Sequence, residues 1–154
     1  AAVAVNDWEF DMTARKVEIG GTSNYPGAVA LGETLELVNE IGIENIQSRV
    51  EELSAYCMEQ LESIGATIIT HKDPGRRAGI VIARIYEDLN TERAILRNLH
   101  AQNIFIAHRF TDYVGGYRIS CQYFNNHKDI DTLVAALKEE IKKVGRAPDY
   151  KRPW

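Results

Sequence analysis

A glycine pair followed by small polar residues, Gly20-Gly21-Thr22-Ser23-Asn24, is the stretch of this sequence best suited to bind a charged ligand. Glycine adopts backbone angles that residues with a Cβ avoid, and the polar side chains stand just ahead of a helix that begins near Pro26. Phosphate and other anions bind where a glycine turn enters a helix N-terminus. The same residues also make an ordinary helix cap, so the segment indicates either an anion site or a well-capped helix start.

The other reactive side chains give weaker indications of a functional site. The two cysteines give no sign of a nucleophile, because Cys57 falls in the apolar stripe of a helix and Cys121 in a predicted strand. Two acidic residues, Asp129 and Asp131, open a predicted helix, where acids are favoured in any case. The histidines show no close metal-ligand spacing, so no metal site is predicted and each is expected on the surface or at a cap: His71, His100, His108 and His127.

Length and charge restrict the class of protein. The chain has 154 residues and a net charge of -4, enough length for one domain with a core and too little positive charge for a nucleic-acid surface. No apolar run reaches membrane-spanning length, and two cysteines suggest a reducing, cytoplasmic setting. The first residue is not Met, which suggests a chain that is processed, tagged or cut from a longer one. We expect a single domain over 1–154, with an N-terminal arm at 1–14 and a tail at 146–154.

Apolar spacing of three and four residues predicts helices, and β-branched runs predict strands. Asn90 is the expected N-cap of the third helix, and Pro74-Gly75 marks the turn of an antiparallel hairpin. The order of elements predicts an α+β two-layer domain, with about four antiparallel strands covered by helices on one face. The predicted helices are 26–41, 43–64, 90–100 and a last one ending at Val144, and the predicted strands are 66–70, 79–85, 103–108 and 117–122.

The chain resembles the small C-terminal domain of class V aminotransferases, which are fold-type I pyridoxal-phosphate enzymes that include cysteine desulfurases. The glycine pair and the Ala/Leu/Gly-rich helix after it resemble the family's glycine-glycine-threonine-proline-asparagine segment. The later motifs resemble its second helix, its arginine strand and its last helix. The resemblance runs from about Trp8 to Lys143 and is carried by Glu18–Asn24, Ile41–Val50, Gly116–Ser120, Phe124-Asn125 and Asp129–Leu133.

This resemblance implies roles for two residues. Thr22 matches the threonine that reaches across the dimer to the cofactor phosphate of the other subunit. Arg118 matches the arginine that binds the substrate carboxylate. Asn125 is expected to contribute to substrate binding beside it. A hydroxyl suits a phosphate oxygen, and a guanidinium makes a bidentate pair with a carboxylate. The alternatives are a helix-capping side chain for Thr22 and a solvated strand residue for Arg118. Tyrosines near Arg118 would shape a pocket or pack in the core: Tyr113, Tyr117 and Tyr123.

The chain departs from the family at the residues that do the chemistry. In the family the cofactor is held by a lysine of the large domain, and no lysine here stands in that context. Desulfurases also carry a nucleophilic cysteine on a loop before the arginine strand. The corresponding loop here, Arg109–Gly115, has no cysteine, so desulfurase chemistry is unsupported. No catalytic residue is therefore predicted, and pyridoxal phosphate is implied only through the family.

Three functions remain open. The chain is a small domain that is inactive alone and completes a pyridoxal-phosphate site with a separate large domain, or a non-catalytic module that binds a small carboxylate or a protein partner. It is otherwise a recombined fragment without a selected activity. We expect a homodimer or a large-domain partner, because Trp8, Phe10 and the slim first helix at Gly27, Ala28 and Gly32 would otherwise be exposed.

Overall fold

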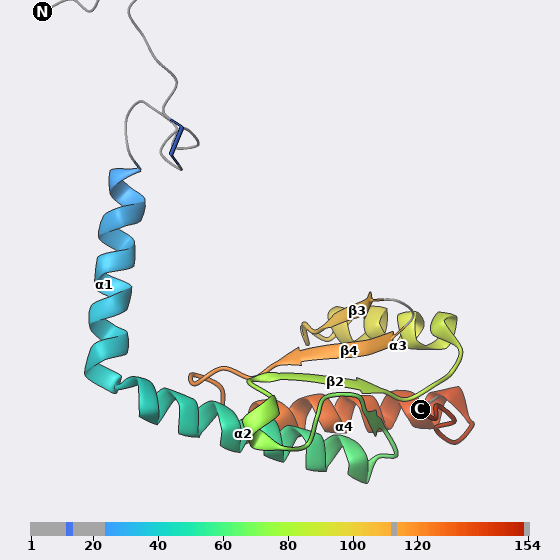
Figure 1. The fold of residues 1–154 in the computed structure, drawn as a ribbon. Coiled ribbons are helices and arrows are strands. Elements are labelled where there is room, and N and C mark those ends of the chain that lie inside the picture. Colours follow the sequence, from blue (N-terminus) through green and yellow to red (C-terminus); the bar gives the residue numbers. More distant parts are fainter. Residues whose placement is uncertain (1–11, 14–23, 112–113, 153–154) are drawn as a thin grey trace, which may run out of the picture. The chain divides into compact units, whose positions relative to one another are not determined.

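The computed structural model of the chain describes residues 12–13, 24–111 and 114–152 (Figure 1). The chain divides into two units, 1–40 and 41–154. A short 3-10 helix, Pro74–Arg76, lies between β1 and β2. The other elements, in chain order, are α1 (Tyr25–Ile41), α2 (Ile43–Ser63), β1 (Thr67–Ile68), β2 (Ile80–Arg84), α3 (Leu89–Ala101), β3 (Ala107–Thr111), β4 (Val114–Ser120) and α4 (His127–Val144).

The four strands form one antiparallel sheet in the order β1-β2-β4-β3. Strand β4, which carries Arg118, is therefore an inner strand, with Ile82 of β2 on one side of Arg118 and Ala107 of β3 on the other. Gly116 permits this close pairing, because a Cβ there would collide with the carbonyl oxygen of Ala83. The predicted hairpin of β1 and β2 is confirmed, although β1 is only two residues long.

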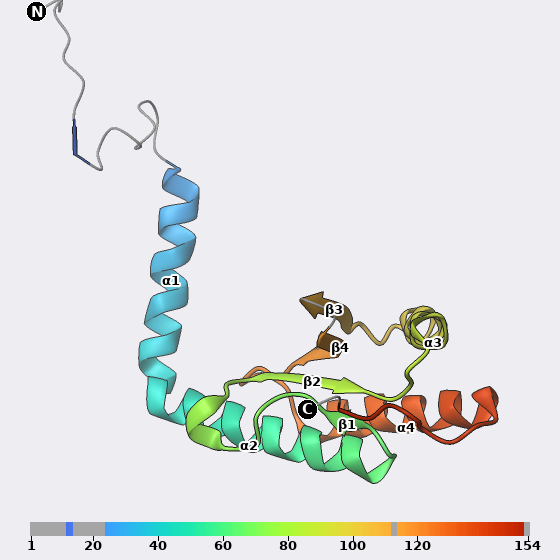
Figure 2. The same cartoon turned by 45° about the vertical axis from the view of Figure 1, so that its right-hand side comes forward.

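The helices of this unit cover one face of the sheet. Alternation along β2 and β4 directs Val81, Tyr117 and Ile119 into the core, where all three are buried. Figures 1 and 2 both place α2 and α4 beneath the sheet. The hydroxyl of Tyr117 donates to the carbonyl oxygen of Glu92, which ties α3 to the same face. The predicted α+β architecture, with four antiparallel strands and a helical layer, is confirmed.

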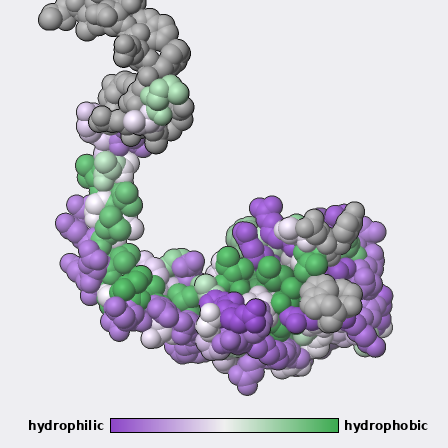
Figure 3. Space-filling model, viewed as in Figure 1, coloured by the Kyte–Doolittle hydropathy of each residue, from purple (hydrophilic) through white to green (hydrophobic). Residues whose placement is uncertain are grey.

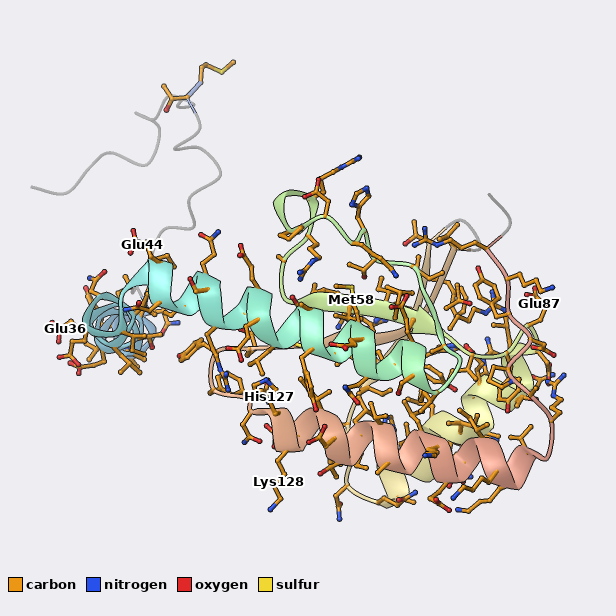
Figure 4. All side chains as sticks on the ribbon, turned by 90° about the horizontal axis from the view of Figure 1, so that it is seen from below. Glu36, Glu44, Met58, Glu87, His127 and Lys128 are labelled. Atoms are coloured by element: carbon orange, nitrogen blue, oxygen red, sulfur yellow. The ribbon has the colours of Figure 1, made fainter. Side chains whose placement is uncertain are left out.

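Helices α2 and α4 lie side by side, as Figure 4 shows from below. The apolar stripe predicted for α2 is buried at Leu53, Cys57 and Leu61. At one end of the contact, the Tyr56 hydroxyl donates to Asp131 Oδ1 over 2.6 Å, and this hydrogen bond raises the pKa of Tyr56. His127 is labelled there in Figure 4, and its ring meets that of Tyr56 edge-on at 4.5 Å. These contacts fix the first turn of α4, which borders the candidate site.

The third strand begins later than the sequence predicts. The run 103–108 is apolar enough for a strand, but only Ala107 and His108 of it pair with β4. Asn103 takes a left-handed φ of 60°, and the N–H of Ile104 bonds back to the carbonyl of Leu99. Residues 103–106 therefore form the turn that ends α3 and do not pair with β4. The predicted loop from Arg109 onward is instead strand as far as Thr111.

The cap of the third helix is Asp88, so the prediction of Asn90 was wrong. The Asp88 carboxylate accepts hydrogen bonds from the N–H groups of Asn90 and Thr91, both at 3.1 Å. Asp88 alone precedes the helix with extended backbone angles, which is the geometry an N-cap requires, whereas Asn90 already lies inside the first turn.

The C-terminal segment, predicted as a tail, packs against the sheet over its described residues. The N–H groups of Asp149 and Tyr150 both donate to the carbonyl of Ile85. Tyr150 is buried, and the guanidinium of Arg84 lies 4.2 Å from the centre of its ring. Farther on, Arg152 donates to the carbonyls at the end of β1. The segment thus covers the edge of the sheet at β1 and protects it from pairing with another chain.

Helix α1 has no buried residue. Its start is capped by Asn24, whose Oδ1 accepts a hydrogen bond from the N–H of Gly27 over 3.0 Å. Apolar surface runs along the helix in Figure 3, and the exposed large side chains are Tyr25, Val29, Leu31, Leu35 and Leu37. In the described part of the chain, no helix is long and apolar enough to cross a membrane. Trp8 and Phe10, predicted to anchor the arm, lie outside the described residues.

Candidate functional site

A pocket of about 720 Å³ opens where residues 103–106 diverge from the end of β4. Its other walls are the end of α3 and the first two turns of α4. The polar and charged side chains that line it are His100, Asn103, Arg118, Ser120, Cys121, Asn125, Asp129 and Thr132. The structure thus brings Arg118 and Asn125, which are seven positions apart in the sequence, to one pocket.

Arg118 is held here by its place in the sheet. Its neighbours along β4, Tyr117 and Ile119, are buried in the core, so Arg118 alternates to the opposite face. The side chain is half-buried, and its Nε is shielded from solvent without a hydrogen-bond acceptor in the described part of the chain. A buried donor left without an acceptor is destabilising. The guanidinium is therefore suited to an acceptor that a ligand brings, and a carboxylate is the best match to its fork.

Asn125 contributes mainly by shaping the turn between β4 and α4. Its Oδ1 accepts the N–H of Gln122 over 2.9 Å, and its Nδ2 donates to Asp129 Oδ2 over 3.2 Å. Its backbone carbonyl also accepts from Arg49 of α2 over 3.1 Å. Both ends of the amide are thus already used, and one Nδ2 hydrogen is left for a ligand. This arrangement makes Asn125 a residue that positions the pocket wall.

The first turn of α4 is fixed by a reciprocal cap. Asn126 Oδ1 accepts the N–H of Asp129 over 3.2 Å, and Asp129 Oδ2 accepts the N–H of Asn126 over 3.0 Å. This capping box satisfies two backbone donors that would otherwise lack partners. Asp129 lines the pocket, but its Oδ2 is occupied by these bonds. Asp129 at the start of this helix thus has a structural role, as the sequence suggested.

The two cysteines meet beside the pocket. Cys57 of α2 is buried, and Cys121, one residue beyond β4, lines the pocket with 3 % of its surface exposed. A hydrogen bond with Cys121 and burial raise the pKa of the Cys57 thiol, whereas the bond from Cys57 lowers the pKa of Cys121. The prediction that Cys57 is a small buried apolar residue is confirmed.

The remaining wall is apolar and is braced by a histidine. His100 Nε2 lies 3.0 Å from the carbonyl oxygen of Ile106 and so donates to it, which ties the end of α3 to the segment before β3. The ring of Phe105 lies 5.5 Å from that of His100 and is 75 % exposed. Sequence reasoning missed this wall because 103–106 was predicted as a strand. The signal that could have found it is Asn103, since asparagine favours the left-handed turn that ends a helix.

The other predicted site residues fall elsewhere. Tyr117 packs in the core with its hydroxyl bonded to Glu92, which settles its role as structural. Burial raises its pKa above the ordinary range. Thr22 and Tyr113 lie outside the described residues. No group of three or more His, Cys, Asp or Glu side chains suited to a metal ion occurs within residues 12–13, 24–111 and 114–152.

Comparison with known proteins gives the family. The sequence profile of the family described as "Aminotransferase class-V" matches residues 1–133. The chain belongs to the class V aminotransferase family. A probable cysteine desulfurase of Xylella fastidiosa is 30% identical over 144 residues, which are 88% of this chain and 34% of that protein. A probable cysteine desulfurase of Halalkalibacterium halodurans is 25% identical over 90% of this chain and 33% of its own length.

Solved structures agree on the fold of this class V aminotransferase chain. A cysteine desulfurase from Thermococcus onnurineus, in its apo form, superposes with a TM-score of 0.76 at 17% identity, covering 93% of this chain and 37% of that one. An alanine–glyoxylate aminotransferase from Nostoc sp. gives a TM-score of 0.67 at 23% identity, covering 84% and 34%. The chain spans about a third of the length of the curated relatives it matches.

The residues of the pocket fit part of what the family's cofactor chemistry needs. The solvent-shielded Nε of Arg118 fits a substrate carboxylate. The described residues that line the pocket include no lysine to hold pyridoxal phosphate. The pocket therefore offers a guanidinium suited to a carboxylate, and no described lining residue could bind the cofactor covalently.

Proposed function

We propose that this chain is the small C-terminal domain of a class V aminotransferase-like protein, that it is inactive alone, and that it completes a pyridoxal-phosphate site with a large domain. The observation that carries the proposal is the guanidinium of Arg118, which lines a pocket while its buried Nε lacks an acceptor in the described part of the chain. The share of its relatives that the chain spans, about a third, suits one domain of such an enzyme.

The parts assigned to this chain are few. Arg118 binds and orients the substrate carboxylate, and Asn125 holds the wall beside it through its bonds to Gln122 and Asp129. Thr22 would donate its hydroxyl to the cofactor phosphate of a second subunit, as the family resemblance implies. Pyridoxal phosphate, when bound, supplies the electron sink for chemistry at the substrate's α-carbon. The lysine that holds it would come from the large domain, and the setting would be cytoplasmic.

A non-catalytic carboxylate-binding module is the second candidate. It is favoured by one observation: every described residue that lines the pocket belongs to the unit 41–154, so the pocket needs no other part of the chain. Both candidates use Arg118 in the same way. They differ in whether a large domain is required for the biological activity.

Complementation separates the two. The intact chain is mixed with the large domain of a class V relative that carries the cofactor lysine, and the visible absorbance of the cofactor is followed while an amino acid is added. We expect a spectral change that needs both pieces and is lost in Arg118→Gln. Arg109→Gln, an exposed arginine on β3 outside the pocket, is the matched control and should behave as wild type. Failure of the two pieces to associate would reject the split enzyme and leave the binding module.

A further inference from the structure

We infer that the pocket around Arg118 accepts a carboxylate that carries an extended apolar chain, and that this chain lies in a groove along α4. The inference rests on the proposed carboxylate role of Arg118 and adds the chemical class of the rest of the ligand. Three features carry it: the charge at one end of the pocket, the aliphatic wall beyond it, and a second hollow that continues the first.

The charged end favours a single anionic group. Asp129 is the one acidic side chain among the described residues that line the pocket, and its Oδ2 already accepts from Asn126 and Asn125. In the described part of the chain, Arg118 makes no ion pair within 4.0 Å. A carboxylate at Arg118 would satisfy the buried Nε and pair with a cation that has no internal counter-ion.

The wall beyond Arg118 offers apolar surface for a chain. Phe105 is 75 % exposed at the pocket, although an aromatic ring gains much from burial. Ile130 and Leu133 are buried in the core and reach the pocket from α4, one turn apart. The large apolar side chains that line the pocket are Ile104, Phe105, Ile106, Ile119, Ile130 and Leu133. A small polar amino acid bound at Arg118 would leave most of this apolar surface exposed to solvent.

A second hollow of about 610 Å³ extends the pocket along α4. The two hollows share Ile104 and Thr132, so they adjoin. Beyond Thr132 the hollow is lined by Ala135 and Ala136, and its polar side chains are Gln102, Lys138, Glu139 and Lys142. Together the hollows form a groove that leads from the guanidinium past Ile104 and onto α4. The volumes of the two hollows, about 720 and 610 Å³, suit a chain of several methylenes better than a two- or three-carbon substrate.

Chain length is the variable that tests this. The intact protein is titrated with acetate, butanoate, hexanoate and octanoate, and binding is followed by amide chemical shifts. Each buried methylene should tighten binding about fourfold until the groove is filled. Hexanol and hexylamine, which lack the carboxylate, should bind far more weakly than hexanoate. Shifts should appear at Arg118 with every acid and at Ala135 only with the longer ones.

Two matched variants test where the apolar chain of the ligand lies. Phe105→Ser should weaken octanoate several-fold and leave acetate unchanged, because it removes part of the apolar wall. Phe124→Ser is the control, since Phe124 is 71 % exposed and is not among the described residues that line the pocket. Arg118→Gln should weaken all the acids together. If the two Phe variants weaken octanoate binding equally, the apolar chain of the ligand lies outside the groove and the inference is overturned.

The remaining outcomes separate this inference from the proposed function. Equal affinity for acetate and octanoate, with both lost in Arg118→Gln, would overturn the apolar chain and leave the carboxylate site standing. If longer acids bind more tightly but hexanol binds as well as hexanoate, and if this binding survives Arg118→Gln, the ligand is adsorbing to apolar surface. That outcome would also overturn the inference. Absence of binding by any acid would reject the inference and the carboxylate role of Arg118 together.

Discussion

The imidazole of His108 and the carboxylate of Glu92 form a buried pair, with Nε2 and Oε2 2.9 Å apart. The pair joins β3, the edge strand that precedes the arginine strand, to α3. Oε1 of the same carboxylate accepts the N–H groups of Ile85 and Tyr86, over 2.7 and 3.0 Å. One side chain thus fixes the end of β2, helix α3 and strand β3 relative to one another.

We therefore expect Glu92→Ala to lower the free energy of unfolding by about 3–5 kcal/mol, as is usual when one partner of a buried pair is removed. Glu92→Gln should cost less, because its Oε1 still accepts from Ile85 and Tyr86. Urea unfolding at neutral pH measures both. Glu87→Ala, at an exposed carboxylate labelled in Figure 4, is the control and should change stability little. A loss in Glu92→Ala as small as in the control would show that the pair is dispensable.

The N-cap of α3 should make the stability of the protein depend on pH in the acid range. Hydrogen bonds from the Thr91 hydroxyl and from the N–H groups of Asn90 and Thr91 lower the pKa of Asp88. A depressed folded-state pKa adds stability that is present above the unfolded value, about 3.9, and is lost as pH falls through the folded value. Asp88→Ala should destabilise the protein at pH 7 and reduce its loss of stability below pH 4.

Asp88→Asn separates the cap from the charge. Asparagine caps a helix as well as aspartate does, so stability at pH 7 should stay near wild type, while the acid sensitivity due to Asp88 disappears. Urea unfolding at pH 7 and at pH 3 tests both variants. Equal acid sensitivity in wild type and Asp88→Asn would mean that the titration belongs to other carboxylates.

Much of this fold follows from periodicity in the sequence. Helices α2 and α4 bury side chains spaced by three and four residues, and that spacing can be read directly from the chain. Strand β3 could not be placed correctly, because its register depends on where α3 ends. The left-handed turn at Asn103 and the bond from Ile104 to Leu99 decide that point, and neither is a property of apolar pattern.

The candidate site shows the same division. Arg118 and Asn125 were named from family motifs, and the structure adds what no motif contains: a buried Nε without an acceptor in the described residues, and an amide already used at both ends. The apolar wall of the pocket could not be predicted, since it is made by chain segments that meet only through tertiary packing. The assignment of Thr22 stays a prediction, because it lies outside the described residues.

Arg118 should matter for binding and hardly for stability. An arginine in a buried ion pair would cost several kcal/mol to remove, but within the described ranges Arg118 makes no such pair. We expect Arg118→Gln to change the free energy of unfolding by less than about 1 kcal/mol. Hexanoate should stabilise wild type by mass action and leave the variant unchanged. A large loss of stability without ligand would indicate a structural role instead.

The proposal that this chain is inactive alone predicts no specific reaction with pyridoxal phosphate. The intact chain is mixed with the cofactor, reduced with borohydride and digested, and the labelled lysines are found by mass spectrometry. We expect low, scattered labelling, with exposed residues such as Lys128 and Lys138 no different from the rest. Stoichiometric labelling of one lysine would contradict the claim that the chain is inactive alone.

The exposed face of α1 predicts self-association when no large domain is present. Leu31, Leu35 and Val38 recur at steps of four and three, and Leu31 and Leu35 are 59 % and 52 % exposed. Burial of such an exposed apolar stripe is favourable, and two-fold pairing is the simplest way to achieve it. We expect a homodimer at micromolar concentration, measured by light scattering.

The contact can be located with two identical substitutions on the same helix. Leu35→Glu places a charge in the stripe and should give a monomer, because burying an unpaired carboxylate in an apolar interface is strongly unfavourable. Leu37→Glu is the control: Leu37 is 48 % exposed and lies two positions on, about 160° around the helix from Leu35. It should leave the dimer intact. A monomeric wild type would show that the stripe needs no second copy. A dimer that survives Leu35→Glu would place the contact elsewhere, with the N-terminal arm as the next segment to test.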